Sequence, residues 1–527
     1  MSLERSVVRP SVREWGDFQT PLPLARQICR FLRRLGVSPS VIVEPTFGLG
    51  HFIIAALDTF PDVQLVYGVE IQDKYQGLLE DALRQRANVD DVSAEIRLIQ
   101  GNIFTHRFPV KVTQAENLLI LGNPPWVTNA ELGAAESGNL PKKRNLKALS
   151  GLDALTGKSN FDICEYILLK LLETFSEKPG TLAMLCKTAT ARNIVHILPQ
   201  KHFKVANVRV LEVNAGREFG AAVDACLLVM TFGVRRSAYI CEVSSLDDPD
   251  HTERIFGWAG DKFVSDIQNY DPELDGDSPW VWRQGVKHDC ARIMELGAKD
   301  GVLLNGEGRA VEVESDHFYW LLKGSDLREF EIAAPRKKVI LTQTHLADDT
   351  QLLMMNAPKL WAYLIEHEPW FMKRKSSIYR NKPRFSMFGV GDYSFKPYKV
   401  AISGLHKEAK FSLVCPLENR PVMLDDTCYF LGFDNYLDAL LTASVLNSES
   451  VRKFLRSVVF VDAKRPYTKD VLMRINLAKA AMRSTLLSLH EYWASVDYTP
   501  QSKVTEAEWL RYQQILIPET QQLGLVV

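Results

Sequence analysis

With 527 residues, the chain is long enough for two to four domains, each with a sizeable hydrophobic core. A hydrophobic fraction of 46%, a charged fraction of 24% and a net charge of −1 are typical of a globular protein and exclude one that binds nucleic acid over its whole surface. No stretch approaches the length of a membrane span, and residues 1–15 lack the apolar core of a secretory signal. The eight cysteines form no CxxC pair, which favours reduced, buried thiols and indicates no metal site. We therefore expect a cytoplasmic protein without membrane contact.

The first predicted element is a helix that begins at Thr20 and Pro21. Thr20 suits the N-cap position and Pro21 the first helical position. An apolar face follows at Leu24, Ile28, Phe31 and Leu32. Free backbone amides at such a helix start can hold a carboxylate, although a capped surface helix explains the pattern equally well.

A predicted strand, a glycine turn and a helix come next. The strand covers residues 41–44 and ends at Glu44, and the helical pattern begins at His51. Gly48 and Gly50 lie in the turn between them and allow a ligand to approach the backbone closely. A lone Gly-x-Gly is weak evidence and differs from the dinucleotide-binding fingerprint. The turn therefore predicts a ligand site only if the strands that follow supply further evidence.

Polar and aromatic side chains follow the next two predicted strands. These buried strands cover residues 65–69 and 96–99. Glu70 ends the first, where an acid is placed to bind ribose hydroxyls, and Ile71 beside it can pack on an adenine face. Asn102 follows the second and can accept from the purine amine, while Phe104 can cover the ring. The ordered segments predict an adenosine pocket.

A fourth strand, residues 118–122, is ended by Asn123, Pro124, Pro125 and Trp126. The exocyclic amine of a nucleobase is a poor nucleophile because its lone pair is delocalised into the ring. The Asn123 side-chain oxygen and the Pro124 carbonyl can accept both amine hydrogens, and Trp126 can stack on a base removed from its helix. The alternative is a proline-rich turn with a packed tryptophan.

The rest of the first half contains a polar segment, a helix and two more strands. Residues 129–159 are polar and carry the basic cluster Lys142, Lys143 and Arg144, which suits either a solvated loop or a nucleic-acid contact. The helix is expected over 161–175, and the strands over 181–186 and 225–232. Phe232 closes the last strand. There it can sandwich an extruded base against Trp126, or serve as an ordinary core residue.

In order, these segments resemble the γ-class (Taq-type) DNA adenine-N6 methyltransferases of restriction–modification systems. The resemblance covers about residues 16–232 and implies an α/β fold, a Rossmann-like class I methyltransferase sheet followed by a C-terminal α+β target-recognition region. It implies S-adenosyl-L-methionine as the methyl donor. The implied donor-binding residues are Thr20, Glu44, Gly48, Gly50, Glu70, Ile71, Asn102, Phe104 and Asn123. The implied catalytic residues are Asn123, Pro124, Pro125 and Trp126.

Three positions refine this resemblance. Asn102 stands where the family usually has Asp, and its amide oxygen can still accept from the purine amine. Trp126 replaces the commoner Tyr and keeps a stacking surface. Asn123 as the first residue of the motif favours adenine over cytosine N4, where Ser or Thr is usual.

The second half carries a basic segment rich in aromatic residues. Between residues 371 and 410 there are ten lysines and arginines against two acidic residues, in a chain near neutrality. Its expected DNA contacts are Lys373, Arg374, Lys375, Arg380, Lys382, Arg384, Lys396 and Lys399. A solvated basic face with core aromatics is the alternative. We expect a catalytic domain at 1–235, a region at 236–330 that connects the domains or forms the first part of the target-recognition region, and a DNA target-recognition domain at 331–527.

These features predict a sequence-specific DNA methyltransferase that modifies a flipped adenine in duplex DNA, in a restriction–modification or related defence system. Pro61, Asp62 and Glu70 superficially match a nuclease pattern, but Gln72 occupies its lysine position, so we expect no cleavage activity and a possible separate cognate restriction endonuclease. The Asn-Pro-Pro-aromatic motif also serves RNA and protein-glutamine methyltransferases. A non-catalytic DNA-binding subunit of a defence complex is the alternative from another class.

Overall fold

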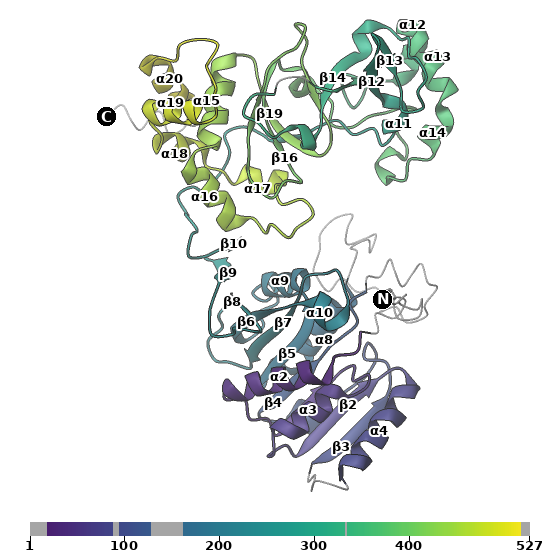
Figure 1. Cartoon of the computed structure of the whole chain (residues 1–527), viewed down its shortest axis with the longest axis vertical. Helices are drawn as coiled ribbons and strands as arrows, with labels where there is room; N and C mark the ends of the chain where they lie inside the picture. Colours follow the sequence, from purple (N-terminus) through teal and green to yellow (C-terminus); the bar gives the residue numbers. More distant parts are fainter. Residues whose placement is uncertain (1–17, 88–93, 128–161, 333–334, 518–527) are drawn as a thin grey trace, which may run out of the picture. The chain divides into compact units, whose positions relative to one another are not determined.

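The chain forms two compact units, residues 1–268 and 269–527 (Figure 1). The structure is a computed structural model that describes residues 18–87, 94–127, 162–332 and 335–517. The basic cluster at 142–144 lies outside these residues. Among the described helices, none is both long and apolar enough to cross a membrane.

The first unit is built on a ten-stranded sheet with the order β10-β9-β8-β6-β7-β5-β4-β1-β2-β3. Strands β5, β4, β1, β2 and β3 pair in parallel, and β7 runs antiparallel between β5 and β6. The strands are β1 (Val41–Glu44), β2 (Leu65–Glu70), β3 (Glu95–Gln100), β4 (Leu118–Gly122), β5 (Gly180–Lys187), β6 (Val205–Val213), β7 (Ala225–Phe232), β8 (Ile240–Ser245), β9 (Arg254–Ala259) and β10 (Lys262–Val264). The central strands β1, β2 and β4 are buried throughout, as expected for parallel strands covered on both faces.

Helices connect these strands. They are α2 (Leu22–Arg34), α3 (His51–Thr59), α4 (Asp73–Ala87), α5 (Val110–Thr113), α8 (Ile163–Phe175), α9 (Thr188–Ile197) and α10 (Ala215–Phe219). Helix α2 packs against α3, and α8 packs against α9. The expected N-cap at Thr20 is wrong, because Pro21 occupies the cap position and no side chain caps the helix. The Thr20 carbonyl instead lies 2.7 Å from His51 Nδ1.

The boundary expected at residue 235 falls inside the first unit. Strand β8 pairs in parallel with β6, and β9 and β10 continue the sheet as hairpins. Since these strands share one hydrogen-bonded sheet with β1–β7, the first unit extends to Gln268.

The second unit combines two small sheets with a group of helices. One sheet has the order β11-β19-β16-β17 and the other β13-β12-β15-β14-β18. The strands are β11 (Arg283–Gln284), β12 (Glu295–Lys299), β13 (Val302–Leu304), β14 (Phe318–Leu322), β15 (Lys337–Ile340), β16 (Tyr398–Ser403), β17 (Ser412–Val414), β18 (Met423–Leu424) and β19 (Cys428–Phe433). The α-helices are α11 (Ala291–Met294), α12 (Leu353–Asn356), α13 (Pro358–Glu366), α14 (Glu368–Met372), α15 (Tyr436–Leu446), α16 (Glu449–Val458), α17 (Lys469–Met473), α18 (Leu477–Met482), α19 (Leu486–Ser495) and α20 (Glu506–Ile515).

No domain boundary separates residues 330 and 331. Leu322 and Leu327, from before that point, share a buried cluster with Ala401 and Phe430, from after it. Strand β14 also pairs with β15 and β18. Residues 269–527 therefore form one α+β unit.

Candidate active site

A cavity opens where β1, β2, β3 and β4 end. Parallel strands present their carboxyl ends at one edge of the sheet, where ligands of open α/β sheets bind. Nine of the residues singled out from the sequence line it, namely Thr20, Glu44, Gly48, Glu70, Ile71, Asn102, Phe104, Asn123 and Pro125. The tertiary structure thus brings together residues that are more than one hundred positions apart in the chain.

The glycine turn closes one side of this cavity. Gly48 and Gly50 have φ of +49° and +71°, in the left-handed region that favours glycine. A Cβ atom on Gly50 would lie 2.4 Å from Leu79 Cδ1, and one on Gly48 would lie 2.4 Å from Gln19 Oε1. Gln19 Oε1 also accepts a hydrogen bond from the Leu49 amide at 2.8 Å. The turn is therefore held in a conformation that leaves its backbone open to the cavity.

The carboxylate of Glu70 links the end of β2 to the glycine turn. Its two oxygens accept from the backbone amides of Gly48 and Gln72, both at 2.9 Å. An acid at the end of the second strand of such a sheet is also placed to bind the ribose hydroxyls of a nucleoside ligand. Glu70 thus fits the sugar of a nucleoside ligand and at the same time shapes the turn beside it.

A second carboxyl group, Glu44, lies at the end of β1. It is almost completely buried, and its Oε2 atom has no hydrogen-bond partner among the described residues. Burial, followed by the nearby charge of Glu70, raises the pKa of Glu44 well above its ordinary value. A buried acceptor without a partner is costly unless a ligand supplies a donor. The polar amino-acid part of S-adenosylmethionine is such a ligand, so the residues present fit this donor.

The loop after β3 lines another side of the cavity. Asn102 Oδ1 accepts from the Phe104 amide at 2.9 Å, which folds the loop so that both residues face the cavity. The Phe104 ring contacts Tyr166 edge-on at 5.3 Å. Lys170 donates to the carbonyls of Ile103 and His106 and ties this loop to α8. The role of Lys170 was not predicted from the sequence, because a lysine within an apolar helical pattern does not indicate which distant loop it contacts.

The Asn123 amide is held in one orientation. Its Nδ2 donates to the Phe18 carbonyl at 2.9 Å, while its buried Oδ1 has no hydrogen-bond partner among the described residues. The hydrogen bond to Phe18 fixes the orientation of the amide. Its Nδ2 donor is therefore used within the protein, and its Oδ1 acceptor is available to a ligand. An acceptor held in this way suits an amine ligand.

Trp126 is packed beneath this turn. Its side chain is 5% exposed, and its Nε1 donates to the Leu185 carbonyl at 3.4 Å. The half-buried ring of Phe219, at the end of α10, contacts it edge-on with centroids 5.1 Å apart. The Phe18 ring lies 6.0 Å away on a tilted plane. Trp126 is therefore an aromatic neighbour of the cavity and not part of its wall.

The expected role of Phe232 as a second stacking residue is wrong. Strand β7 runs antiparallel to β5, so Phe232 pairs with Gly180, which is level with Leu118 at the amino end of β4. Five strand residues, roughly 17 Å, separate that level from the Asn123–Trp126 turn. Phe232 is 2% exposed and belongs to the core. The strand's first residue, Ala225, is the one that lies at the cavity edge of the sheet.

The eight basic residues expected to contact DNA do not share one environment. Lys373, Lys375, Arg380, Lys382 and Arg384 are exposed. Lys396 and Arg384 are paired with Asp434 and Glu368. Arg374 is half-buried and donates to the carbonyls of His288 and Ser386, so its role is structural. Lys399 is 0% exposed and donates to the Lys396 carbonyl at 2.7 Å, so it cannot reach DNA.

We expect Lys399→Met to stabilise the second unit by roughly 2–4 kcal/mol at pH 7 and to leave DNA affinity unchanged. Burial lowers the pKa of Lys399 to about 7. The unfolded chain therefore binds more protons between pH 7 and about 10.5, and wild-type stability rises across that window. Urea unfolding at pH 7 and pH 10 should show the advantage of the variant shrinking at the higher pH. A less stable variant, or a loss of DNA binding, would contradict this assignment.

The fold and the cavity define a class of protein. A parallel core in the order β5-β4-β1-β2-β3 with an antiparallel β7 carries a glycine turn after β1, an acid at the end of β2 and a polar turn after β4. This is the arrangement of class I S-adenosylmethionine-dependent methyltransferases, and it confirms the fold expected from the sequence.

Comparison with known proteins identifies the family. No family model matches the chain. The type II methyltransferase M.NspV of Nostoc sp. is 38% identical over 468 residues, covering 88% of this chain and 96% of that protein. The type II methyltransferase M.XamI of Xanthomonas campestris pv. amaranthicola is 32% identical over 119 residues, 22% of this chain and 21% of that protein. The chain therefore belongs to the type II methyltransferases of restriction–modification systems.

This membership agrees with the fold of the whole chain. The solved structure of the type IIL restriction–modification enzyme MmeI in complex with DNA superposes with a TM-score of 0.52, covering 95% of this chain and 72% of that one, at 11% identity. The likeness therefore includes the second unit as well as the catalytic one. The protein is a DNA methyltransferase that uses S-adenosyl-L-methionine.

Proposed function

We propose that this methyltransferase transfers the methyl group to N6 of a flipped adenine in duplex DNA. The observation that carries the proposal is the fixed Asn123 amide, whose buried Oδ1 lies beside the cavity and accepts no hydrogen bond from the part of the chain that the structure describes. Extruding the base exposes its amine to this acceptor. The cognate endonuclease would be a separate chain, and the eight free thiols suit a cytoplasmic location.

In this proposal the polar turn acts on the amine. Asn123 Oδ1 and the Pro124 carbonyl accept its two hydrogens, which localises the nitrogen lone pair toward the donor. Glu44, Glu70 and the glycine turn hold the donor and exclude water from its polar groups. When bound, S-adenosylmethionine supplies a methyl group activated by a positive sulfonium.

The base identity is tested directly by analysing the product. We expect that duplex DNA treated with the full chain and labelled donor, then digested to nucleosides, contains N6-methyladenine. N4-methylcytosine as the labelled product would overturn the adenine assignment while leaving the DNA methyltransferase intact. RNA and protein acceptors serve as controls and should stay unlabelled.

Phe219 is the aromatic residue that we propose in place of Phe232. It is half-buried against Trp126, and base–aromatic contacts contribute about 1–3 kcal/mol. We expect Phe219→Ala to raise the KM for DNA about tenfold or more, with donor affinity and thermal stability retained. Phe232→Ala should instead destabilise the first unit by about 3–5 kcal/mol, because it empties a buried site. A stable Phe219 variant with unchanged DNA kinetics would contradict this role.

We propose that the exposed cations Lys373, Lys375, Arg380 and Lys382 contact DNA phosphates. Each contact releases about one counterion, so affinity should fall steeply as salt rises. We expect the double variant Lys375→Ala/Lys382→Ala to reduce the slope of log affinity against log salt by about 2. Lys299→Ala removes an exposed cation of β12 in the same unit and is the matched control. Equal slopes for the double variant and wild type would remove this segment from the interface.

A further inference from the structure

Three segments that are far apart in sequence meet around the turn before β19. Residues 283–289 pair with β19 through β11, and Val286 bridges Asp425. The basic segment joins them where the amides of Lys287 and Phe388 exchange hydrogen bonds of 2.8 and 2.9 Å. A third segment arrives through Arg465, whose guanidinium donates to the Asp426 carbonyl at 2.7 Å. Trp282, 1% exposed, anchors the start of this surface.

The polar groups at this junction have both signs. Lys287 Nζ lies 2.7 Å from Asp289 and 3.3 Å from Asp426, and Arg465 lies 3.6 Å from the same Asp426 carboxylate. Gln284 Nε2 donates to the Asp426 carbonyl at 2.6 Å. The charged side chains of this network are between 26% and 32% exposed. We call Arg283, Gln284, Lys287, Asp289, Asp426 and Arg465 the Asp426 surface.

The Asp426 surface differs in charge from a surface that binds only phosphates. Phosphates present only hydrogen-bond acceptors and negative charge, whereas base edges in the major groove present a pattern of donors and acceptors. The Asp426 surface offers guanidinium, ammonium and amide donors together with carboxylate acceptors. Its two carboxylates repel phosphates, and both lie within ion-pair distance of Lys287, whose backbone bridges Phe388. Fixed groups on rigid elements are what discrimination between bases requires.

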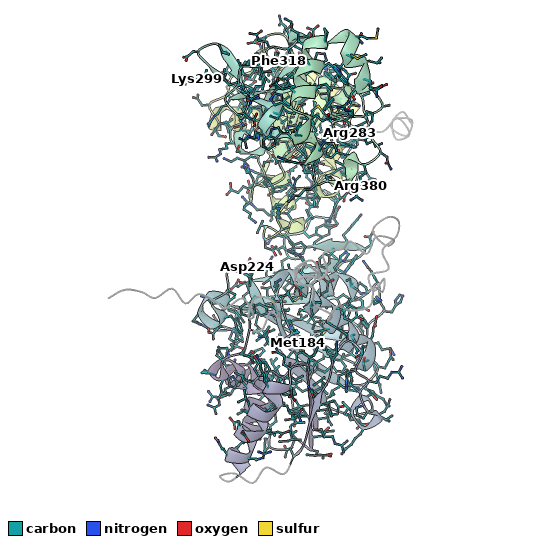
Figure 2. All side chains as sticks on the ribbon, turned by 90° about the vertical axis from the view of Figure 1, so that its right-hand side faces the viewer. Met184, Asp224, Arg283, Lys299, Phe318 and Arg380 are labelled. Carbon is teal, nitrogen blue, oxygen red and sulfur yellow. The ribbon has the colours of Figure 1, made fainter. Side chains whose placement is uncertain are left out.

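The flanking cations complete the arrangement. Arg380 and Lys382 are exposed in the basic segment that the Lys287–Phe388 pairing joins to this surface. Figure 2 shows Arg283 and Arg380 on the same side of the second unit, with Lys299 on the other. Arg283 stacks over the Tyr393 ring at 4.8 Å, which leaves its guanidinium edge open to an acceptor pair such as guanine O6 and N7.

We propose that the Asp426 surface reads base edges in the major groove and sets the sequence that is methylated, with Arg283 and Arg465 as specificity-determining residues. The inference rests on the proposal that the second unit binds duplex DNA. It does not depend on which base is methylated.

The test compares Arg283→Ala and Arg465→Ala with wild type, Lys299→Ala and Lys382→Ala on a random-sequence duplex pool, read by methylation-aware sequencing. We expect the first two variants to lose about ten- to hundredfold in preference for the wild-type site, with relaxation at one or two positions. Lys299→Ala should keep the wild-type profile. Lys382→Ala should lower methylation equally at all sites. An unchanged profile for Arg283→Ala and Arg465→Ala would overturn the inference.

If a variant loses methylation activity, its sequence preference is measured by DNA affinity instead. The affinities for the site selected by wild type and for an unrelated duplex are compared in the full chain, after confirming donor binding. A fall in their ratio supports base reading, and an equal fall in both affinities overturns it. Failure of the proposed function has other signs, namely methylated cytosine or a salt slope unaffected by loss of Lys375 and Lys382.

Discussion

Asn123→Ala is expected to lower kcat for DNA methylation by about 10²–10³-fold while leaving donor affinity unchanged. The wild-type amide donates to the Phe18 carbonyl and presents a buried Oδ1 that is unbonded within residues 18–87, 94–127, 162–332 and 335–517. An acceptor placed in advance lowers the barrier because it is not reorganised during the reaction. Alanine removes that acceptor and places no new group in the cavity.

Single-turnover methylation of a duplex that contains the wild-type site measures the chemical step, and calorimetry measures donor binding. Asn123→Asp is the matched variant. It keeps an acceptor but lacks the N–H that orients the side chain on Phe18, so its activity should fall between those of wild type and Asn123→Ala. If Asn123→Ala turned over as fast as wild type, the assignment of Asn123 to the amine would be wrong.

Glu70→Ala is expected to weaken donor binding about a hundredfold. The carboxylate accepts from the amides of Gly48 and Gln72, so its loss leaves two backbone donors without partners and loosens the glycine turn. It also removes the proposed acceptor for the ribose hydroxyls. Both effects act on the binding of the donor, so kcat at saturating donor should change far less than the donor KM.

Titration calorimetry with S-adenosylmethionine gives the affinity, and thermal unfolding without ligand gives the stability of the first unit. Glu70→Gln keeps one acceptor oxygen at the same position and should lose less affinity than Glu70→Ala. Unchanged donor affinity in a folded Glu70→Ala variant would show that Glu70 stabilises the glycine turn but does not bind the donor.

Most of the donor-binding part of the site could be predicted from local sequence patterns. Buried strands that end at Glu44 and Glu70, or directly before Asn123, could be predicted from the sequence, because parallel strands place their carboxyl ends at one edge. Phe232 was misplaced because an apolar run does not reveal the direction of its strand, and the pairing of β7 with β5 decides it. Phe219 was missed because its contact with Trp126 joins residues that are 93 positions apart.

The environment of each residue in the basic segment also could not be predicted from the sequence alone. The composition of the segment indicated a DNA contact, but composition does not separate exposed Lys375 from buried Lys399, because only the fold shows that Lys399 lies on β16, whose residues 399–403 are all buried. Nor could it show that Lys287, Asp426 and Arg465 form one network.

The sequence by itself determined the class I fold of the first unit and the donor, because both follow from short runs of residues around the ends of successive strands. The tertiary structure decided the orientation of the Asn123 amide, the aromatic neighbour of Trp126, the extent of each unit and the surface around Asp426. These depend on pairings between distant segments, which burial and hydrogen bonding select only when the whole chain has folded.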